Sequence, residues 1–389
     1  MKILVTTFTY PPQASGVSEI AKAQALGLAA LGHEVTVACD FDPKRAEEHS
    51  YGKLTIRQFD VSGNFDPKFG YQGEIAAYQD FIASTPFDII LGNCWQNWAT
   101  DLAIPVFHRT RARKVIMTQG LSAQIWHPQV KFPWGLGQWV RGWPYAWRLP
   151  AVMDSFDQVV FLSHRQDFGR FFDHWLARKT GRKNISIIPN GIHLGDLDRA
   201  ALDFRERYKV RTPHMILNVA NYCDRKNQIA TVRSFLRAWR NDATLVLIGS
   251  EFNEYSEAAR SILTAARGHA GEVLFLERVP KADINAAYRA ADLFMLTAKE
   301  ETQPLAILDA MGCGVPFVST DTGCVREFPG GQVIDDEAGT AAAINQLLDD
   351  PSLRRRLGEE GRMAARTTYS WEQVVLAFEE LFQRLLQNP

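Results

Sequence analysis

Two acidic residues carry the clearest chemical signal in the sequence. The run KEETQPLAILDAMGCGVPFVSTDTGCVRE, residues 299–327, places Glu301 and Asp309 at the two ends of the segment TQPLAIL. An ionised carboxylate can accept two hydrogen bonds from vicinal hydroxyls, as it does at a ribose. An isolated pair of this kind is more often a surface acid and a helix acid, so the surrounding segments decide between the two interpretations.

A short helix expected directly after Glu301 would supply an anion site. Pro304 suits the first turn of a helix because its φ is fixed and its missing N–H would be unpaired there. Gly312 and Gly314 can end this helix. Its free amides and positive dipole end attract a phosphate. A phosphate site flanked by hydroxyl acceptors describes a sugar nucleotide.

A basic pair and a glycine point to the same ligand. Arg225 and Lys226 follow a strand expected at Met215 to Ala220, and ligands of open α/β sheets bind beyond the carboxyl ends of strands. Gly16 ends the turn-rich loop YPPQASG after the first strand, where the missing Cβ lets the backbone approach a ligand. Taken singly, these features are also typical of a solvated turn and of a turn glycine.

Strands alternate with helical segments in both halves of the chain, which predicts an α/β protein with two doubly wound parallel sheets. The expected strands are Lys2 to Thr7, Glu34 to Ala38, Asp88 to Leu91, Lys114 to Thr118, Gln158 to Leu162, Ile185 to Ile188, Met215 to Ala220, Thr244 to Ile248, Val273 to Leu276, Leu293 to Leu296 and Pro316 to Ser319. The last stretch, from Trp371, has apolar residues at helical spacing and predicts an amphipathic terminal helix.

Size and composition exclude several classes of protein. A chain of 389 residues predicts two domains, because single cores stop growing near ~250 to 300 residues. The formal net charge of −1 gives no whole-molecule attraction to nucleic acid. The five cysteines are scattered, and neither a signal peptide nor an apolar run long enough for a membrane span is apparent. We therefore expect a cytoplasmic protein, with a place at the inner face of the plasma membrane left open.

Several motifs together resemble one family. They are YPPQASG followed by LAALGHEVTV, IIPNGI at residues 187–192, NVANYCDRKN, ADLFMLTAKEETQPLAILDAMGCGVPFVSTDTGCVRE and the terminal YSWEQ. In these the chain resembles the retaining, nucleotide-sugar-dependent glycosyltransferases of family 4 (glycosyl transferases group 1), over nearly its whole length. The resemblance implies the GT-B fold, with two facing Rossmann-like domains and a C-terminal helix that crosses back to the N-terminal domain. It places an acceptor-binding domain at 1–203 with the helix 371–389, and a nucleotide-sugar-binding domain at 204–370.

The resemblance also implies roles for single residues. Glu301 would bind donor-sugar hydroxyls near the reacting carbon, and Lys226 the diphosphate leaving group, as the two catalytic residues. Asp309 would bind the ribose. The remaining donor contacts would come from Arg225, from Gly16 and from the backbone at Thr302, Gln303 and Leu305.

Four positions depart from the family pattern. Asn221 stands where the family often has an arginine, Asp309 where glutamate is commoner, and Pro304 where glycine is usual. Gln119 stands after a strand where many relatives have histidine. Its amide can hydrogen-bond an acceptor hydroxyl but cannot exchange a proton near neutral pH. It is equally a candidate for loop scaffolding.

The segment FPWGLGQWVRGWPYAWRLP combines aromatic and basic residues: Trp134, Trp139, Trp143, Trp147, Lys131, Arg141 and Arg148. This composition suits a membrane interface, and so would a lipid-linked acceptor. The tryptophans could instead fill the core or line an acceptor groove.

The expected function is retaining transfer of a sugar from a nucleotide diphosphate sugar to a hydroxyl acceptor, either a glycan or a lipid-linked molecule, in polysaccharide, lipopolysaccharide or other glycoconjugate biosynthesis. We expect no metal cofactor, because the cationic side chains can neutralise the diphosphate. A non-catalytic nucleotide-sugar-binding subunit and a sugar-nucleotide epimerase of the same fold remain as alternatives.

Overall fold

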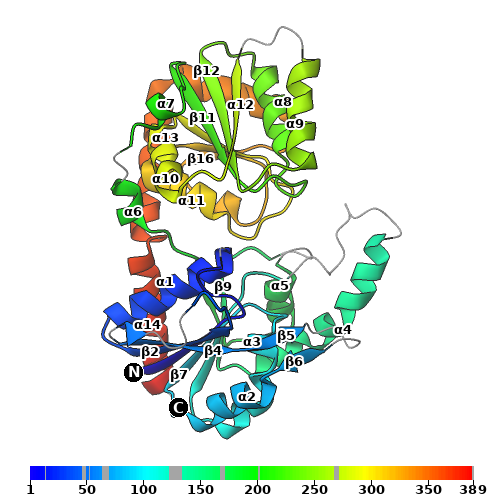
Figure 1. Ribbon diagram of the computed structural model, residues 1–389, viewed down its shortest axis with the longest axis vertical. Helices are drawn as coiled ribbons and strands as arrows, with labels where there is room; N and C mark the ends of the chain where they lie inside the picture. The colour runs from blue at the N-terminus through cyan, green and yellow to red at the C-terminus, as the bar shows by residue number, and fades with distance from the viewer. Residues whose placement is uncertain are drawn as a thin grey trace. The chain divides into compact units, whose positions relative to one another are not determined.

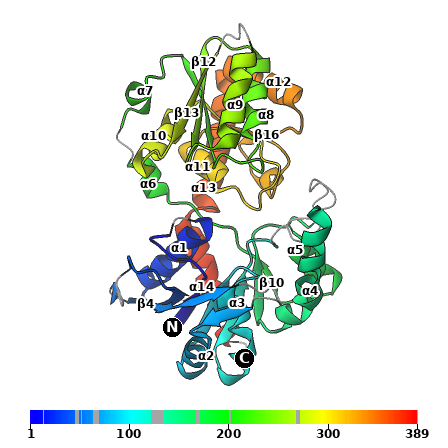
Figure 2. The same ribbon diagram turned by 45° about the vertical axis from the view of Figure 1, so that its right-hand side comes forward.

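The structure is a computed structural model that describes residues 1–13, 15–45, 50–51, 53–63, 70–121, 134–166, 171–199, 202–266 and 271–387, with the backbone alone at 50–51 and 134–143. The chain forms two compact units. The N-terminal unit comprises Met1–Asn190 with Val374–Pro389, and the C-terminal unit comprises Gly191–Gln373. Figures 1 and 2 show that each unit is built around its own sheet.

The sheet of the N-terminal unit has the strand order β10-β9-β8-β7-β1-β2-β4-β3, and all of its neighbours are parallel except β3 and β4. Strands β2, β3 and β4 lie on one side of β1 in this sheet, and the later strands β7 to β10 lie on its other side. The strands are β1 (Lys2–Thr6), β2 (Glu34–Asp40), β3 (Ser50–Tyr51), β4 (Leu54–Phe59), β7 (Ile89–Asn93), β8 (Arg113–Met117), β9 (Gln158–Phe161) and β10 (Ile185–Ile187), with a separate hairpin of β5 (Val61–Gly63) and β6 (Tyr71–Gly73).

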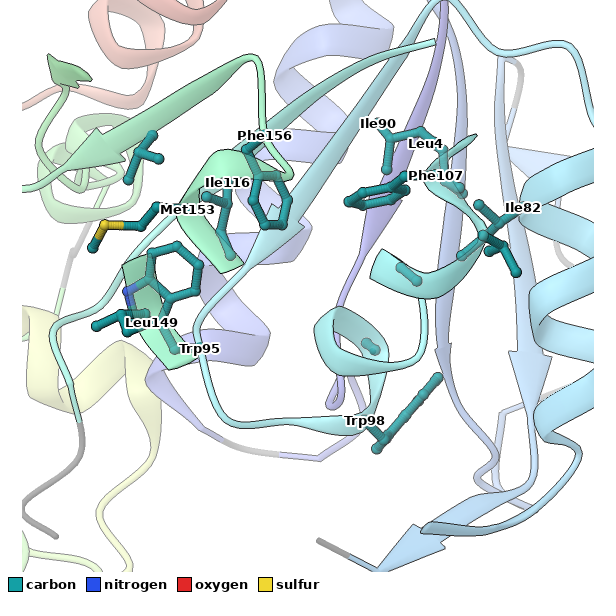
Figure 3. Close-up of a cluster of buried hydrophobic side chains, with 14 of the residues drawn as sticks. Leu4, Ile82, Ile90, Trp95, Trp98, Phe107, Ile116, Leu149, Met153 and Phe156 are labelled. Carbon is teal, nitrogen blue, oxygen red and sulfur yellow. The ribbon is translucent and has the colours of Figure 1, made fainter. Parts of the chain in front are cut away.

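The helices of this unit are α1 (Gly16–Ala30), α2 (Ile75–Ser84), α3 (Trp98–Asp101), η1 (Ile104–Arg109), α4 (Trp134–Asp154), α5 (Phe172–Lys179) and α14 (Trp371–Gln387). Strand residues Leu4, Ile90 and Ile116 point from one face of the sheet into a buried cluster that includes Ile82 of α2 and Met153 of α4 (Figure 3). Hydrophobic residues in these strands are fully buried, which is the pattern of a parallel sheet covered on both faces.

The terminal helix α14 completes the N-terminal unit and lies beside α1 (Figure 1). A Cβ added at Gly27 of α1 would lie 2.4 Å from Cγ2 of Val375, so the two helices approach closely at this glycine. Nε2 of His33 lies 3.4 Å from Oε1 of Glu379. The predicted return of the C-terminal helix to the N-terminal domain is therefore confirmed. Its apolar face is formed by Val374, Val375, Phe378, Leu381 and Phe382, all buried.

The C-terminal unit contains a six-stranded parallel sheet in the order β13-β12-β11-β14-β15-β16. This is the Rossmann order, in which the chain runs outward from the first strand on one side and from the fourth on the other. The strands are β11 (His214–Val219), β12 (Ala243–Gly249), β13 (Glu272–Glu277), β14 (Leu293–Leu296), β15 (Phe317–Ser319) and β16 (Gly331–Val333).

Helices cover both faces of this second sheet: Figure 2 shows α8, α9 and α12 on one side and α10 and α11 on the other. Their bounds are α6 (Leu194–Asp198), α7 (Phe204–Arg207), α8 (Gln228–Ala238), α9 (Glu254–Ala265), α10 (Lys281–Ala290), α11 (Leu305–Cys313), η2 (Val325–Glu327), α12 (Glu337–Asp349) and α13 (Pro351–Thr367). Within the described ranges, no helix is both long enough and apolar enough to cross a membrane.

All eleven strands expected from the sequence are present, with ends within two residues of the expected ones. The α/β fold with two Rossmann-like sheets is confirmed. The strands β3, β4 and β16 and the hairpin of β5 and β6 were not predicted from the sequence.

Candidate active site

The fold brings two loops of the C-terminal unit together at the carboxyl ends of the central strands of its sheet. Strands β11 and β14 are neighbours, but the chain continues from β11 towards β12 and from β14 towards β15. The residues that follow them, 220–227 and 297–304, therefore lie side by side beyond the carboxyl ends of the strands. In open parallel sheets this point, where the strand order reverses, is where ligands bind.

Three of the predicted site residues meet in these loops. Nζ of Lys226 forms an ion pair with Oε1 of Glu301, and Nη1 of Arg225 lies 3.8 Å from Oε2 of the same carboxylate. The Glu301 side chain is 9% exposed, that of Lys226 18% and that of Arg225 48%. Two cationic side chains thus lie beside a carboxylate that is largely shielded from water, as a buried charge requires. Glu301 and Lys226 were expected to bind separate parts of a ligand. In the structure the two side chains contact each other directly.

Hydrogen bonds to backbone carbonyls fix the two loops to each other. The Lys299 N–H donates to the Arg225 carbonyl over 2.9 Å, and the Thr297 hydroxyl donates to the Asn227 carbonyl over 2.8 Å. Asn227 has φ of 52°, in the left-handed region that non-glycine residues rarely adopt. The charged side chains are thus carried by a constrained backbone, as a preorganised site requires.

The segment that follows Glu301 is held by a turn from elsewhere in the chain. The Cys324 N–H donates to the Thr302 carbonyl over 2.9 Å, and Thr302 and Gln303 are buried. Gly323 has φ of 54°, and a Cβ there would lie 2.2 Å from the Thr302 carbonyl oxygen. Only glycine fits this close approach.

Helix α11 begins beside this segment. Pro304 is its cap, with φ of −73° and ψ of 101°, so it precedes the helix and does not stand in the first turn as expected. The Ile307 and Leu308 amides already donate to the Pro304 carbonyl, whereas those of Leu305 and Ala306 come before the first helical hydrogen bond. Gly314, with φ of 72°, ends the helix as predicted.

Asp309 lies within α11 in different surroundings from Glu301. Burial raises the pKa of its carboxyl group to about 6, and the positive charge of Lys281 opposes this shift. The Asp309 charge in turn contributes to the raised pKa values of Tyr288 and Cys313, although burial is the larger cause for both. The charge of Asp309 therefore interacts with Lys281 and Tyr288, which α10 carries.

Gly16 is the first residue of α1 in the N-terminal unit. Ser15 caps this helix by accepting a hydrogen bond from the Ser18 N–H over 3.1 Å. A Cβ added at Gly16 would meet no described atom within 4 Å, and its φ is outside the left-handed region. Neither the backbone conformation nor described neighbours explain a glycine here, in contrast to Gly323.

Gln119, which follows β8, makes a reciprocal pair of hydrogen bonds with Asn190. Its Nε2 donates to the Asn190 Oδ1 over 3.1 Å, and the Asn190 Nδ2 donates to its Oε1 over 2.8 Å. Asn190 belongs to the motif IIPNGI and was not among the site residues predicted from the sequence. The pair fixes the orientation of the half-buried Gln119 side chain.

Asp173 was not identified from the sequence. Its buried Oδ2 accepts hydrogen bonds from Nε1 of Trp95 over 2.8 Å and from the Thr118 hydroxyl over 2.5 Å. It thus joins α5 to the loops after β7 and β8, next to Gln119. An aspartate in an amphipathic helix looks like a surface residue, so no local signal identifies this role.

The aromatic and basic segment lies mostly in α4. Lys131 lies outside the described residues, as do the side chains of Trp134, Trp139, Arg141 and Trp143. Trp147 is 80% exposed and Arg148 is exposed, whereas Tyr145 and Leu149 are buried in the core. Trp147 therefore does not fill the core, which was one of the interpretations left open. Across the described residues, no group of three or more His, Cys, Asp or Glu side chains is arranged to hold a metal ion.

Two protein families match the chain in sequence. Residues 14–196 match the family described as Glycosyltransferase Family 4, and residues 213–350 match the family described as Glycosyl transferases group 1. N-acetyl-alpha-D-glucosaminyl L-malate synthase of Bacillus anthracis is 26% identical over 183 residues, which are 45% of this chain and 46% of that protein. The matching part thus spans less than half the length of this relative.

Solved structures resemble the whole chain. The sucrose-phosphate synthase of Thermosynechococcus elongatus has a TM-score of 0.77 at 19% identity, with all of both chains covered. The Anabaena protein HepE in complex with UDP-glucose has a TM-score of 0.69 at 14% identity, covering 99% of this chain and 100% of that one. At such identities the likeness shows the fold, which is GT-B.

Proposed function

We propose a function for this chain from one premise: it belongs to the group 1 glycosyltransferases of family 4. In this proposal it moves a glycosyl group from a nucleotide diphosphate sugar to an acceptor hydroxyl and retains the anomeric configuration. The observation that carries the proposal is the pairing of Lys226 with Glu301 at the point where the strand order of the C-terminal sheet reverses.

Lys226 and Glu301 bind different parts of the donor. The transition state of glycosyl transfer is cationic at the sugar and anionic at the departing phosphate. Lys226, with Arg225 beside it, stabilises the developing phosphate charge, a preorganised effect worth about 3 kcal/mol for a single donor group. Glu301 accepts hydrogen bonds from sugar hydroxyls. Donor binding replaces the contact between the two side chains, so that each turns to its own part of the ligand.

The start of α11 and Asp309 bind the rest of the donor. We assign the backbone at Thr302, Gln303 and Leu305 to sugar or phosphate oxygens, because the positive end of a helix dipole attracts anions. Asp309 accepts hydrogen bonds from the ribose. Since burial raises the pKa of this carboxyl group to about 6, its acceptor strength depends on pH in the range of ordinary assays.

Two residues of the N-terminal unit complete the assignment. We assign Gly16 to the donor phosphates, because open space around its Cα position allows a ligand to approach the backbone. We assign Gln119 to an acceptor hydroxyl, since its amide is oriented by Asn190. The reaction needs no dedicated carboxylate nucleophile, because the leaving phosphate can take the acceptor's proton.

The same cationic groups make a metal unnecessary in this proposal. Lys226, Arg225 and the α11 amides neutralise the diphosphate, a task that Mg²⁺ performs in many phosphate-binding sites. Turnover that persists in excess EDTA would support metal independence, and turnover restored only by added Mg²⁺ or Mn²⁺ would exclude it.

The acceptor in this proposal is a glycan or a lipid-linked hydroxyl compound of glycoconjugate biosynthesis, and the protein works in the cytoplasm at the inner face of the membrane. The exposed Trp147 next to Arg148 supports peripheral contact, since aromatic and basic side chains together favour the headgroup region.

A thermal-shift screen tests the donor assignment. A ligand that binds only the folded protein raises its melting temperature by mass action. UDP-, GDP- and ADP-linked hexoses are the probes, and free nucleotide release is then measured for each ligand that stabilises the protein. A transferase releases nucleotide when an acceptor is added and shows slow hydrolysis without it. A protein that binds the donor but leaves it intact with every acceptor is a non-catalytic binding subunit.

A further inference from the structure

A buried arginine holds the loop between β1 and α1. Arg45, which follows β2, is 7% exposed. Its Nε donates to the Pro11 carbonyl over 2.7 Å, and its Nη2 donates to the Tyr10 carbonyl over 2.7 Å. The guanidinium also lies over the Tyr10 ring, 5.7 Å from its centre. Two consecutive carbonyls of the loop are thus bound by one side chain.

The same guanidinium is anchored to the sheet. Its Nη1 donates to Oε1 of Gln58 in β4 over 3.0 Å and to the backbone carbonyl of Asp40 at the end of β2. Its Nη2 lies 3.5 Å from Oδ1 of Asp40. A guanidinium carries five N–H donors in a rigid plane, so it can serve loop and sheet at once. A lysine at this position keeps the charge but cannot reach this set of acceptors.

Asp40 holds the loop at a second point. Its Oδ2 accepts a hydrogen bond from Nε2 of Gln13 over 2.7 Å, while the Gln13 Oε1 accepts from the Thr9 hydroxyl over 3.3 Å. Arg45 and Asp40 therefore fix residues 9–13 from the side of β2. The loop leads directly to the Ser15 cap and to Gly16 at the start of α1.

This loop lies where a ligand of the N-terminal sheet would bind. Strands β1 and β7 are neighbours from which the chain continues in opposite directions, so the loop after β1 borders the reversal point of this sheet. We propose that Arg45 and Asp40 are positioning residues that fix the conformation of the loop 7–13 and thereby place Gly16 for the donor phosphates. This inference rests on the proposed function, in which Gly16 binds the donor.

The test compares Arg45→Met and Arg45→Lys with wild type and with the control Arg109→Met. Arg109 is an exposed arginine of the same unit that pairs with Asp80 on the surface. The readouts are kcat and KM for the nucleotide sugar selected by the thermal-shift screen, together with hydrogen–deuterium exchange of residues 7–13. Both Arg45 variants should raise the donor KM about 10-fold with little change in kcat, because the loop must be reordered on binding. Exchange in residues 7–13 should rise, and the control should match wild type.

Arg45→Lys keeps the positive charge but removes the guanidinium. A donor KM that stays raised in this variant would show that the geometry of the guanidinium, and not its charge alone, is required. If Arg45→Met does not fold, Gln13→Leu tests the same loop, because this exposed residue donates a hydrogen bond to Asp40 and accepts one from Thr9. A smaller rise in the donor KM and in exchange is then expected. Arg45 variants that lose thermal stability but keep the donor KM would overturn the positioning role. Wild-type protein that binds no nucleotide sugar would instead overturn the proposed function, and this inference with it.

Discussion

Lys226 and Glu301, 75 residues apart in the sequence, form an ion pair at the carboxyl ends of the neighbouring strands β11 and β14. Each partner is largely shielded from water, so removing Glu301 takes this counterion from Lys226, whereas removing Lys226 leaves Glu301 with the more distant Arg225. The pair is therefore both a local structural contact and the proposed catalytic centre. The two roles can be separated by measuring folding and turnover in the same variants.

Glu301→Ala and Lys226→Ala should each lower kcat by about 100-fold or more, because each removes a group that acts on developing charge. Circular dichroism should show that both variants remain folded. Lys299→Ala is the matched control, since Lys299 lies in the same loop and pairs with the exposed Asp224. Turnover at the wild-type rate in either test variant would reject the assignment.

Donor affinity should depend on the ionisation of Asp309. Its carboxyl group has a pKa raised to about 6, so it becomes protonated below that pH and can no longer accept hydrogen bonds from both ribose hydroxyls. Isothermal titration should show donor binding that weakens as the pH falls below about 6, approaching a 10-fold loss per pH unit. Asp309→Asn should bind more weakly and without this pH dependence. An unchanged pH profile in the variant would contradict the ribose assignment.

Ionisation of Asp309 should lower the stability of the folded protein, although it strengthens donor binding. Because its folded-state pKa lies above the usual value of 3.8, the folded protein holds this proton more tightly than the unfolded chain does. The free energy of unfolding should therefore fall as the pH rises from about 4 to about 6 and then level off, by about 2 kcal/mol for this partly exposed group. Urea unfolding across this range should show a shallower fall for Asp309→Asn. Parallel curves for the two proteins would argue against the raised pKa.

Two glycine variants should separate a structural glycine from a ligand-binding one. Gly323→Ala should destabilise the protein by about 2 kcal/mol, because the new Cβ meets the Thr302 carbonyl and φ is positive. Gly16→Ala should leave the melting temperature unchanged, since its Cβ meets no described atom within 4 Å, but should raise the donor KM. If Gly16→Ala binds the donor like wild type, Gly16 is an ordinary helix-start residue.

Trp147→Ala should reduce binding to vesicles that contain anionic lipid, because an exposed indole next to an arginine contributes to interfacial binding. Trp239→Ala is the control, since Trp239 is 63% exposed in the other unit. Sedimentation with vesicles measures the bound fraction. Equal binding by Trp147→Ala and wild type would exclude this contact.

The regular elements could be predicted because buried parallel strands are continuous apolar runs. Strand β14, LFML, is fully buried and its limits were predicted to the residue. Strand β4 was missed because it alternates buried residues with Thr55, Arg57 and other polar side chains, and β16 was missed because two of its three residues are a glycine and a glutamine. Such strands form because they pair with a neighbouring strand, and the local sequence does not show which strand that is.

Parts of the candidate site depend on contacts that only folding creates. The positions of Glu301 and Lys226 followed from the ends of their strands, but their direct pairing depends on which strands are neighbours. Arg45 stands in the sequence DFDPKRAE, which looks like an exposed charged loop, yet its guanidinium is buried against backbone carbonyls. A buried arginine has the same local sequence signal as a solvated one.

Because α14 packs on α1, the N-terminal unit is assembled from two segments separated by the entire C-terminal unit. During translation the hydrophobic side of α1 around Gly27 is complete only when residues 374–387 have left the ribosome. The C-terminal unit, which is continuous in the chain, can close its core earlier. Nascent chains should therefore expose the α14-binding surface of α1 until late in synthesis.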